Sequence, residues 1–159
     1  MAANNRVTVT INGTKFNAAC ASVKFSTQVD QTGTAVMGSL ASEIRVFANF
    51  HDTANLPFSA LQSFFNLANV VTLQNIVPMQ IDYWKDDSAQ DVLYSYKFNG
   101  WIARFETVNP SSATSNLNLD GDSAELQYQG ITPTLNHMLI LDLQPAMNQA
   151  NYASVSMSN

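Results

Sequence analysis

The chain has 159 residues, enough for one domain with a sizeable hydrophobic core. Its net charge is −5 and its seven basic residues are spread singly from Arg6 to Arg104, which argues against binding a nucleic-acid backbone. Charged residues make up only 12% of the chain, about half the usual share, so much of the surface is neutral polar or apolar. This composition suits a protein covered by copies of itself, although a secreted β-domain rich in Ser, Thr and Asn would look similar.

The single cysteine, Cys20, cannot form an internal disulfide, so we expect the chain to fold in a reducing cytoplasm. Residues 1–6 lack the basic and apolar stretches of a secretory signal peptide, and no apolar run is long enough to span a membrane. We therefore expect no membrane insertion and, if the protein leaves the cell, a route that reads no such signal.

Alternation of apolar and polar residues, the pattern of a strand with one buried face, recurs along the chain. Asn12 and Gly13 form a strong turn signal between the first two strands. Turn signals recur about every eight to twelve residues, which favours a barrel or sandwich of about eight strands. The predicted strands cover residues 6–11, 14–19, 22–29, 40–50, 75–84, 92–105 and 138–143, with one more around Ala124, Leu126 and Tyr128 after a turn at Asp120 and Gly121.

One helix is predicted, over residues 57–69. Pro57 suits a first helical turn. We expect the helix to cover an open end or side of the sheet. Its apolar face is predicted from spacings of three and four residues at Phe58, Leu61, Phe65 and Ala68, with Phe64 alongside.

The strand over residues 92–105 is the centre of the predicted sheet. Its apolar residues alternate as far as Phe98 and resume in the opposite phase at Trp101, with Asn99 and Gly100 at the change. A change of phase needs an extra residue or a reversal of the chain. Asn99 and Gly100 therefore predict either a bulge within one long strand or a two-residue hairpin turn.

A long excursion between strands is predicted at residues 30–39. It holds two glycines and no charge after Asp30. Val36 and Met37 are unusual at the tip of a free loop, and they make sense if the loop is buried when copies assemble.

No catalytic or metal-binding motif is visible. His51 and His137 are far apart in the sequence, and neither has a Cys or a second His at ligand spacing. Asp120, Asp122 and Glu125 do not follow the calcium-loop pattern, and the glycines form no phosphate-binding loop. We predict that the protein is not an enzyme and holds no metal or cofactor.

Three segments in this order of elements carry a resemblance: SVKFSTQVDQTGTAVMGSLASEIRV, QIDYWKDDSAQDVLYSYKFNGWIARFE and NHMLILDLQP. They resemble the haemolysin-coregulated protein (Hcp) family, the tube proteins of type VI secretion systems, and more distantly the tail-tube proteins of contractile phages. Phe25, Asp30 and Gly33 match that family's strand running into a Thr/Gly-rich loop, and the segment from Lys97 to Phe105 matches its long central strand.

The resemblance implies a compact β-barrel of two packed antiparallel sheets with one helix on the side, as a single domain over residues 1–147 with a polar tail at 148–159. It implies hexameric rings that stack into a tube, which sheath contraction drives out of the cell, with effectors as cargo. The implied partners are other copies, the contractile sheath, and baseplate and spike proteins. Assembly would be cytoplasmic, followed by secretion without a signal peptide. The family's central strand is continuous, which favours the bulge at Asn99 and Gly100.

The same resemblance implies that the loop reaches a neighbouring ring or protomer. Two alternatives remain from the residues: a monomeric binding module for a carbohydrate or small apolar ligand, with exposed Trp84 or Trp101 in a groove, and a hydrolase on a jelly-roll-like barrel. The residues that the resemblance places in the contact with a neighbouring ring or protomer are Asp30, Gln31, Thr32, Gly33, Thr34, Ala35, Val36, Met37 and Gly38.

Overall fold

The computed structural model describes residues 6–39, 41–69, 71–108, 137–146 and 156–159. The predicted mainly-β class is confirmed, with one α-helix, α1 (Phe58–Asn69), and a short 3-10 helix, η1 (Leu73–Asn75), among the described residues. The strands are β1 (Val7–Ile11), β2 (Thr14–Ala18), β3 (Cys20–Ser26), β4 (Ala41–Asn49), β5 (Val77–Trp84), β6 (Val92–Val108), β7 (Met138–Pro145) and β8 (Ser156–Ser158).

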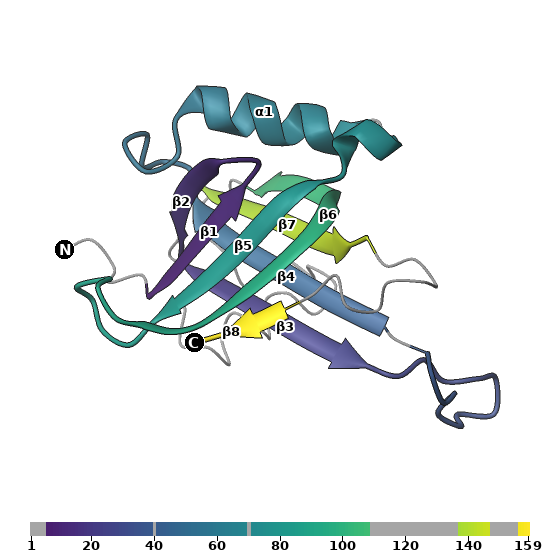
Figure 1. Cartoon of the computed structure of the whole chain (residues 1–159). Helices are drawn as coiled ribbons and strands as arrows, with labels where there is room; N and C mark the ends of the chain where they lie inside the picture. The colour runs from purple at the N-terminus through teal and green to yellow at the C-terminus, as the bar shows by residue number, and fades with distance from the viewer. Residues whose placement is uncertain (1–5, 40, 70, 109–136, 147–155) are drawn as a thin grey trace, which may run out of the picture.

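The strands form one antiparallel sheet in the order β2-β1-β5-β6-β7-β4-β3, with β8 added to β6. The 17-residue β6 joins its two halves, because residues 92–100 pair with β5 and residues 100–108 pair with β7. Figure 1 shows β1 and β5 crossing in front of β7, β4 and β3. The two sheets implied by the resemblance are thus two layers of one sheet, whose order ends at β2 and β3 without closing.

The central strand is continuous, so the hairpin alternative for Asn99 and Gly100 is wrong. Asn99 pairs in regular register with Pro78, and Gly100 pairs on both sides of the strand, with Val77 and Pro145. The ladder of β6 with β7 shifts register further along the strand, between Ile102 and Arg104. An extra residue at Ala103 therefore accounts for the irregularity that the sequence placed at Asn99 and Gly100.

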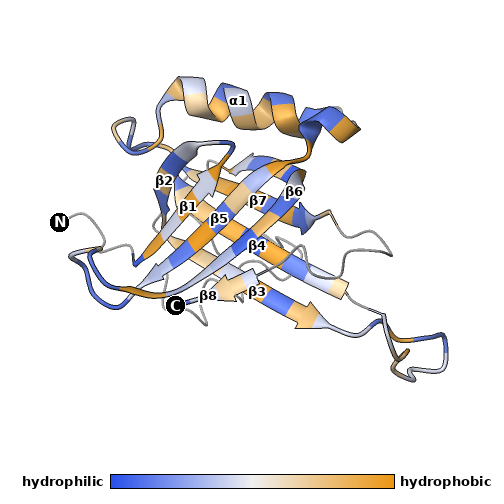
Figure 2. Cartoon of the chain, viewed as in Figure 1, coloured by the Kyte–Doolittle hydropathy of each residue, from blue (hydrophilic) through white to orange (hydrophobic). Residues whose placement is uncertain are grey.

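The hydrophobic core lies between the two layers. Alternation along β5 and the first half of β6 sends every second side chain inward, and Figure 2 shows the resulting orange and blue bands along these strands. Fully buried members come from both layers, among them Val9, Ile11, Ile81, Ile102 and Leu141.

Helix α1 lies across one end of the two layers, as predicted (Figure 1). Its buried residues are Ala60 and Phe64, and the ring of Phe64 lies 5.4 Å from that of Phe16 on β2. The predicted face is partly wrong, because Phe58 is 75% exposed and Phe65 49% exposed. The helix has aromatic residues on two faces, and the face centred on Phe64 is the one that packs against the sheet.

The far end of the chain returns to the sheet as β8, which pairs with residues 95–97 of β6. The predicted strand around Leu126 and the turn at Asp120 lie outside the described residues. None of the described helices has the length and apolar character needed to cross a membrane. The division of the chain into a domain at 1–147 and a tail at 148–159 stays a prediction.

Candidate interaction surface

Residues 27–39 form a small hairpin of their own that projects beyond the end of β3 (Figure 1). Val29 and Ala35 form an isolated antiparallel bridge, and the N–H of Val36 donates to the carbonyl of Gln28 at 2.8 Å. The predicted strand over 22–29 therefore ends at Ser26 in the sheet, and its last residues pair within the excursion instead.

The carboxylate of Asp30 organises the tip of this hairpin. Its Oδ1 accepts hydrogen bonds from the N–H and hydroxyl of Thr32, at 2.8 and 2.6 Å, and from the N–H of Thr34 at 3.0 Å. These bonds, foremost that from the Thr32 side chain, lower the pKa of Asp30 from its ordinary value. Gly33 completes the turn at φ +82°, where a side chain would be strained. The ionised carboxylate is thus the form that holds the turn.

A second turn at the base of the hairpin presents Met37. The N–H of Ser39 donates to the carbonyl of Val36 at 3.2 Å, and Gly38 has φ +80°, the geometry of a type II turn. The Ser39 hydroxyl also donates to Val36, at 2.6 Å, and accepts from the N–H of Gln28 at 2.9 Å. The corner of this turn is therefore fixed by the chain's own hydrogen bonds.

Three apolar side chains of the hairpin are exposed to solvent in the single chain. Val29 is 64% exposed, Val36 43% and Met37 99%. Asp30 is the one charged residue of the segment. An ordered protrusion with exposed apolar side chains and a single, internally bonded charge is suited to contact with another protein. The structure brings the predicted residues 30–38 together, and their contact with another copy stays a prediction.

A ladder of alternating charges, not found from the sequence, crosses the outer face of the layer that holds β3, β4 and β7. Its centre is Asp142, whose carboxylate lies 2.8 Å from Nε of Arg45 and 3.8 Å from Nη1 of Arg104. Opposite charges two residues apart on one strand, as in Glu43 and Arg45, are the only local signal. Across the sheet its members are Lys24, Glu43, Arg45, Asp142, Arg104 and Glu106.

Tyrosines of β5 and β6 pack together and link the two layers at β3. The hydroxyl of Tyr83 on β5 donates to the carbonyl of Ala21 on β3 at 2.9 Å, and its ring stacks on Tyr94 at 4.7 Å. Burial raises the pKa of Tyr83 above its ordinary value, so the hydroxyl remains a neutral donor. Phe25 extends this cluster through a ring contact of 6.2 Å with Tyr96, so the root of the hairpin is anchored in aromatic packing.

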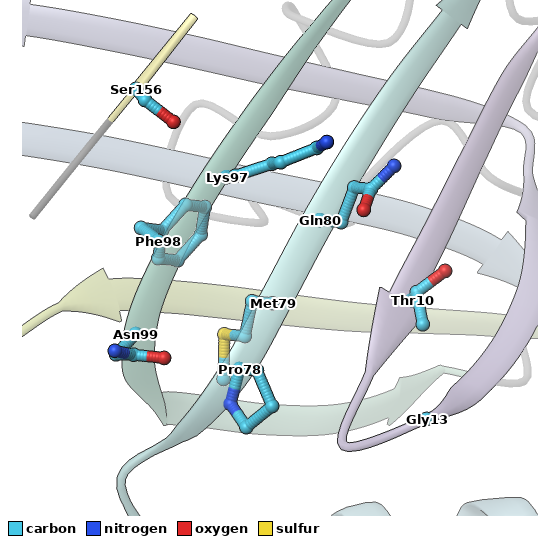
Figure 3. Close-up of a pocket in the computed structure, with 9 residues that line it drawn as sticks. All are labelled: Thr10, Gly13, Pro78, Met79, Gln80, Lys97, Phe98, Asn99 and Ser156. Carbon is cyan, nitrogen blue, oxygen red and sulfur yellow. The ribbon is translucent and has the colours of Figure 1, made fainter.

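An open groove of about 410 Å³ lies over β1, β5 and β6. Figure 3 shows the side chain of Lys97 extending toward Gln80 across this groove. Neither tryptophan lines it, and Trp84 instead donates its Nε1–H to the hydroxyl of Thr8 at 2.7 Å. The groove therefore lacks the exposed tryptophan that the binding-module alternative required, although the aromatic residue Phe98 is among its lining residues. Its lining residues are Thr10, Gly13, Pro78, Met79, Gln80, Lys97, Phe98, Asn99 and Ser156.

The two histidines, distant in the sequence, meet in the structure. The rings of His51 and His137 stack with centroids 4.9 Å apart and an interplanar angle of 16°. Within the described ranges, no group of three or more His, Cys, Asp or Glu side chains is placed to hold a metal ion.

No protein-family model and no curated protein sequence matches the chain. Among solved structures, Hcp1 from Flavobacterium johnsoniae is similar, with a TM-score of 0.56 and 10% identity over 96% of this chain and 94% of that one. A crystal structure of an Hcp protein gives a TM-score of 0.53 at 10% identity, over 96% and 98% of the two chains. The tube-terminating cap of the anti-feeding prophage gives 0.52 at 14% identity, over 97% and 88%.

These likenesses establish the fold, which this chain shares with Hcp proteins and with a tube-terminating cap. The resemblance drawn from the sequence is thereby confirmed at the level of the fold, over nearly the whole chain.

Proposed function

We propose that the protein is a structural, non-catalytic subunit of the inner tube of a contractile injection system of the type VI secretion kind. Hexameric rings of the chain stack into a tube, and contraction of a surrounding sheath expels it. The observation that carries this proposal is the ordered hairpin with exposed Val29, Val36 and Met37 on a fold shared with Hcp proteins and a tube cap.

The hairpin supports the proposal through its energetics. Moving one Val or Met side chain from water into a contact stabilises that contact by about 1.5–3 kcal/mol. Because Asp30 and Ser39 already fix the hairpin, little conformational entropy remains to be lost on binding. A contact between two different patches of identical subunits closes into a ring or extends as a stack, and each subunit repeats the gain.

The remaining parts of the proposal concern partners and location. The tube assembles in the cytoplasm on a baseplate, inside a contractile sheath and behind a spike, and effectors travel in its lumen. The low charged fraction of 12% supports a surface that copies of the chain cover.

Negative-stain electron microscopy of the purified protein, with light-scattering mass, tests the proposal. We expect rings or tubes with a central hole. A species of one chain at high concentration, with no rings, would count against a tube. If tryptophan fluorescence then shifted with a panel of sugars, the monomeric binding module would replace it.

A further inference from the structure

Strands β7 and β8 lie along the same edge of β6. The ladder of β7 reaches Asn99, whose carbonyl accepts a hydrogen bond from the N–H of Ala146 at 2.8 Å. It resumes with Ser156 opposite Lys97 and runs antiparallel to β6, as β7 does. Together the two strands cover this edge from residue 108 to residue 95 of β6.

The chain between these strands is far longer than the path within one subunit requires. On β6 a single residue, Phe98, separates Asn99 from Lys97, whereas nine residues, 147–155, separate Ala146 from Ser156. Nine residues can span up to about 30 Å, which is on the order of the diameter of a domain of this size. The sequence length therefore allows the last strand to reach a neighbouring subunit.

The backbone pairing with β6 is the main interaction that holds β8 in place. All three of its residues are exposed, and Met157 leaves 67% of its surface in water. Among the described residues β8 pairs with β6 alone, and no side-chain hydrogen bond or ion pair is found for Ser156 or Ser158. Leaving its own β6 costs the chain a few backbone hydrogen bonds, and an identical β6 in another copy returns them.

The edge that β8 covers needs a partner strand. Tyr94, Tyr96 and Phe98 give this half of β6 high strand propensity, and Lys97 is its one charged residue. An uncovered edge with so little charge is a template for uncontrolled pairing with other chains. A β8 strand supplied by a neighbouring subunit protects this edge of β6 and also links the two subunits.

We propose that this edge of β6 accepts the C-terminal strand of a second copy, so that β8 is exchanged between neighbouring subunits. The inference rests on the proposed function only in requiring an assembly of copies. Exchange of an identical element reuses every contact already present in the chain and is a low-cost route to association.

A disulfide between opposed residues distinguishes exchange from pairing within one chain. Lys97 and Ser156 are exposed partners in the ladder, and opposed Cα atoms of antiparallel strands lie within the range that a disulfide spans. The variant Lys97→Cys/Ser156→Cys is assembled, oxidised and analysed on a non-reducing gel, with Cys20 left in place because it is buried. We expect most of the cross-linked protein to run as two or more chains, and an equal mixture of the two single variants to give a covalent dimer.

The control is Thr10→Cys/Lys15→Cys, which joins opposed residues of the β1–β2 hairpin and should cross-link only within one chain. Rings with cross-links only within single chains would overturn the exchange and leave the tube function standing. Neither rings nor interchain cross-links would overturn both. Interchain cross-links without rings would support the exchange and count against the tube.

Discussion

Gly100 of β6 lies so close to Gln144 of β7 that a Cβ on the glycine would be 2.4 Å from the main-chain oxygen of Gln144. Real Cβ atoms essentially never come under 3.0 Å, and the obstacle here is backbone that side-chain rotation cannot move. Gly100 is also the residue at which β6 pairs with both β5 and β7. The close approach is therefore where the two layers meet.

Gly100→Ala is expected to destabilise the fold by about 1–3 kcal/mol, the usual cost of forcing a methyl group into a packed site. Urea unfolding followed by circular dichroism measures the change. The matched control is Asn99→Ala, because Asn99 is exposed and its backbone bond to Ala146 is retained. Equal stability of the two variants would contradict the close approach.

Asp142 holds the charge ladder together, and its removal should cost more than removal of an outer member. Its side chain is 26% exposed and lies against Arg45, which is 16% exposed. Asp142→Ala leaves partly buried arginines without this carboxylate and should lower the free energy of unfolding by about 1–2 kcal/mol. Glu43→Ala, at a side chain 55% exposed, should cost less than about 0.5 kcal/mol. The free energy of unfolding is measured with urea, because guanidinium is a salt that screens charge. Equal losses of unfolding free energy in the two variants would show that Asp142 is not the centre of the ladder.

Strand positions could be predicted because alternation is a local property. The predicted β1, β5 and β7 agree with the structure to within about two residues. One face of β1 and of β5 is buried in the core, and the apolar β7 has buried residues on both faces. The end of β3 could not be predicted in this way, because Val29 continues the alternating pattern beyond the last residue of the strand. Asp30 and Gly33 instead fold the chain back on itself. Local turn chemistry there outweighs the strand pattern.

Contacts between distant residues carried no signal in the sequence. Arg45 and Asp142 are 97 residues apart, and the stacking of His51 on His137 depends on the same pairing of β4 with β7. The buried face of α1 differs from the predicted one for a related reason. Phe58 and Phe65 have helical spacing, but the shape of the sheet end selects Phe64.

Asp30→Ala is expected to loosen the hairpin without unfolding the domain. The carboxylate is fully exposed and bonds only within the turn, so faster amide hydrogen exchange at Thr32 and Thr34 is expected, with an unchanged melting temperature. Asp86→Ala, which removes a carboxylate bonded to Ser88, is the matched control and should leave these two amides unchanged.

The same turn should depend on pH in a defined direction. The folded-state pKa of Asp30 is lowered, so its stabilising effect is present above the unfolded value of about 3.9 and is lost as pH falls through the folded value. We therefore expect protection of the Thr32 amide at neutral pH and its loss in acid, once the pH falls below the lowered pKa of Asp30. Protection that persisted after the Asp30 carboxylate had been protonated would show that the carboxylate does not hold the turn.

Val36→Asp/Met37→Asp is expected to leave the fold intact and to weaken stacking of the rings. Met37 is 99% and Val36 43% exposed in the single chain, and the backbone bond from Val36 to Gln28 does not depend on the side chain. A charge buried without a partner at a contact is costly, so the concentration needed for assembly should rise at least about tenfold, which corresponds to about 1.4 kcal/mol per subunit. Tube length by electron microscopy and sedimentation give the measurement.

The control for added charge compares Met37→Asp with Gln62→Asp, which adds the same charge at an exposed position of α1, outside the predicted contact residues 30–38. If apolar contact drives stacking, the first variant shortens the tubes and the second does not, because repulsion between exposed charges is screened beyond about 8–10 Å. Equal shortening would assign the effect to net charge, and unchanged tube length in the double variant would remove Val36 and Met37 from the contact between rings.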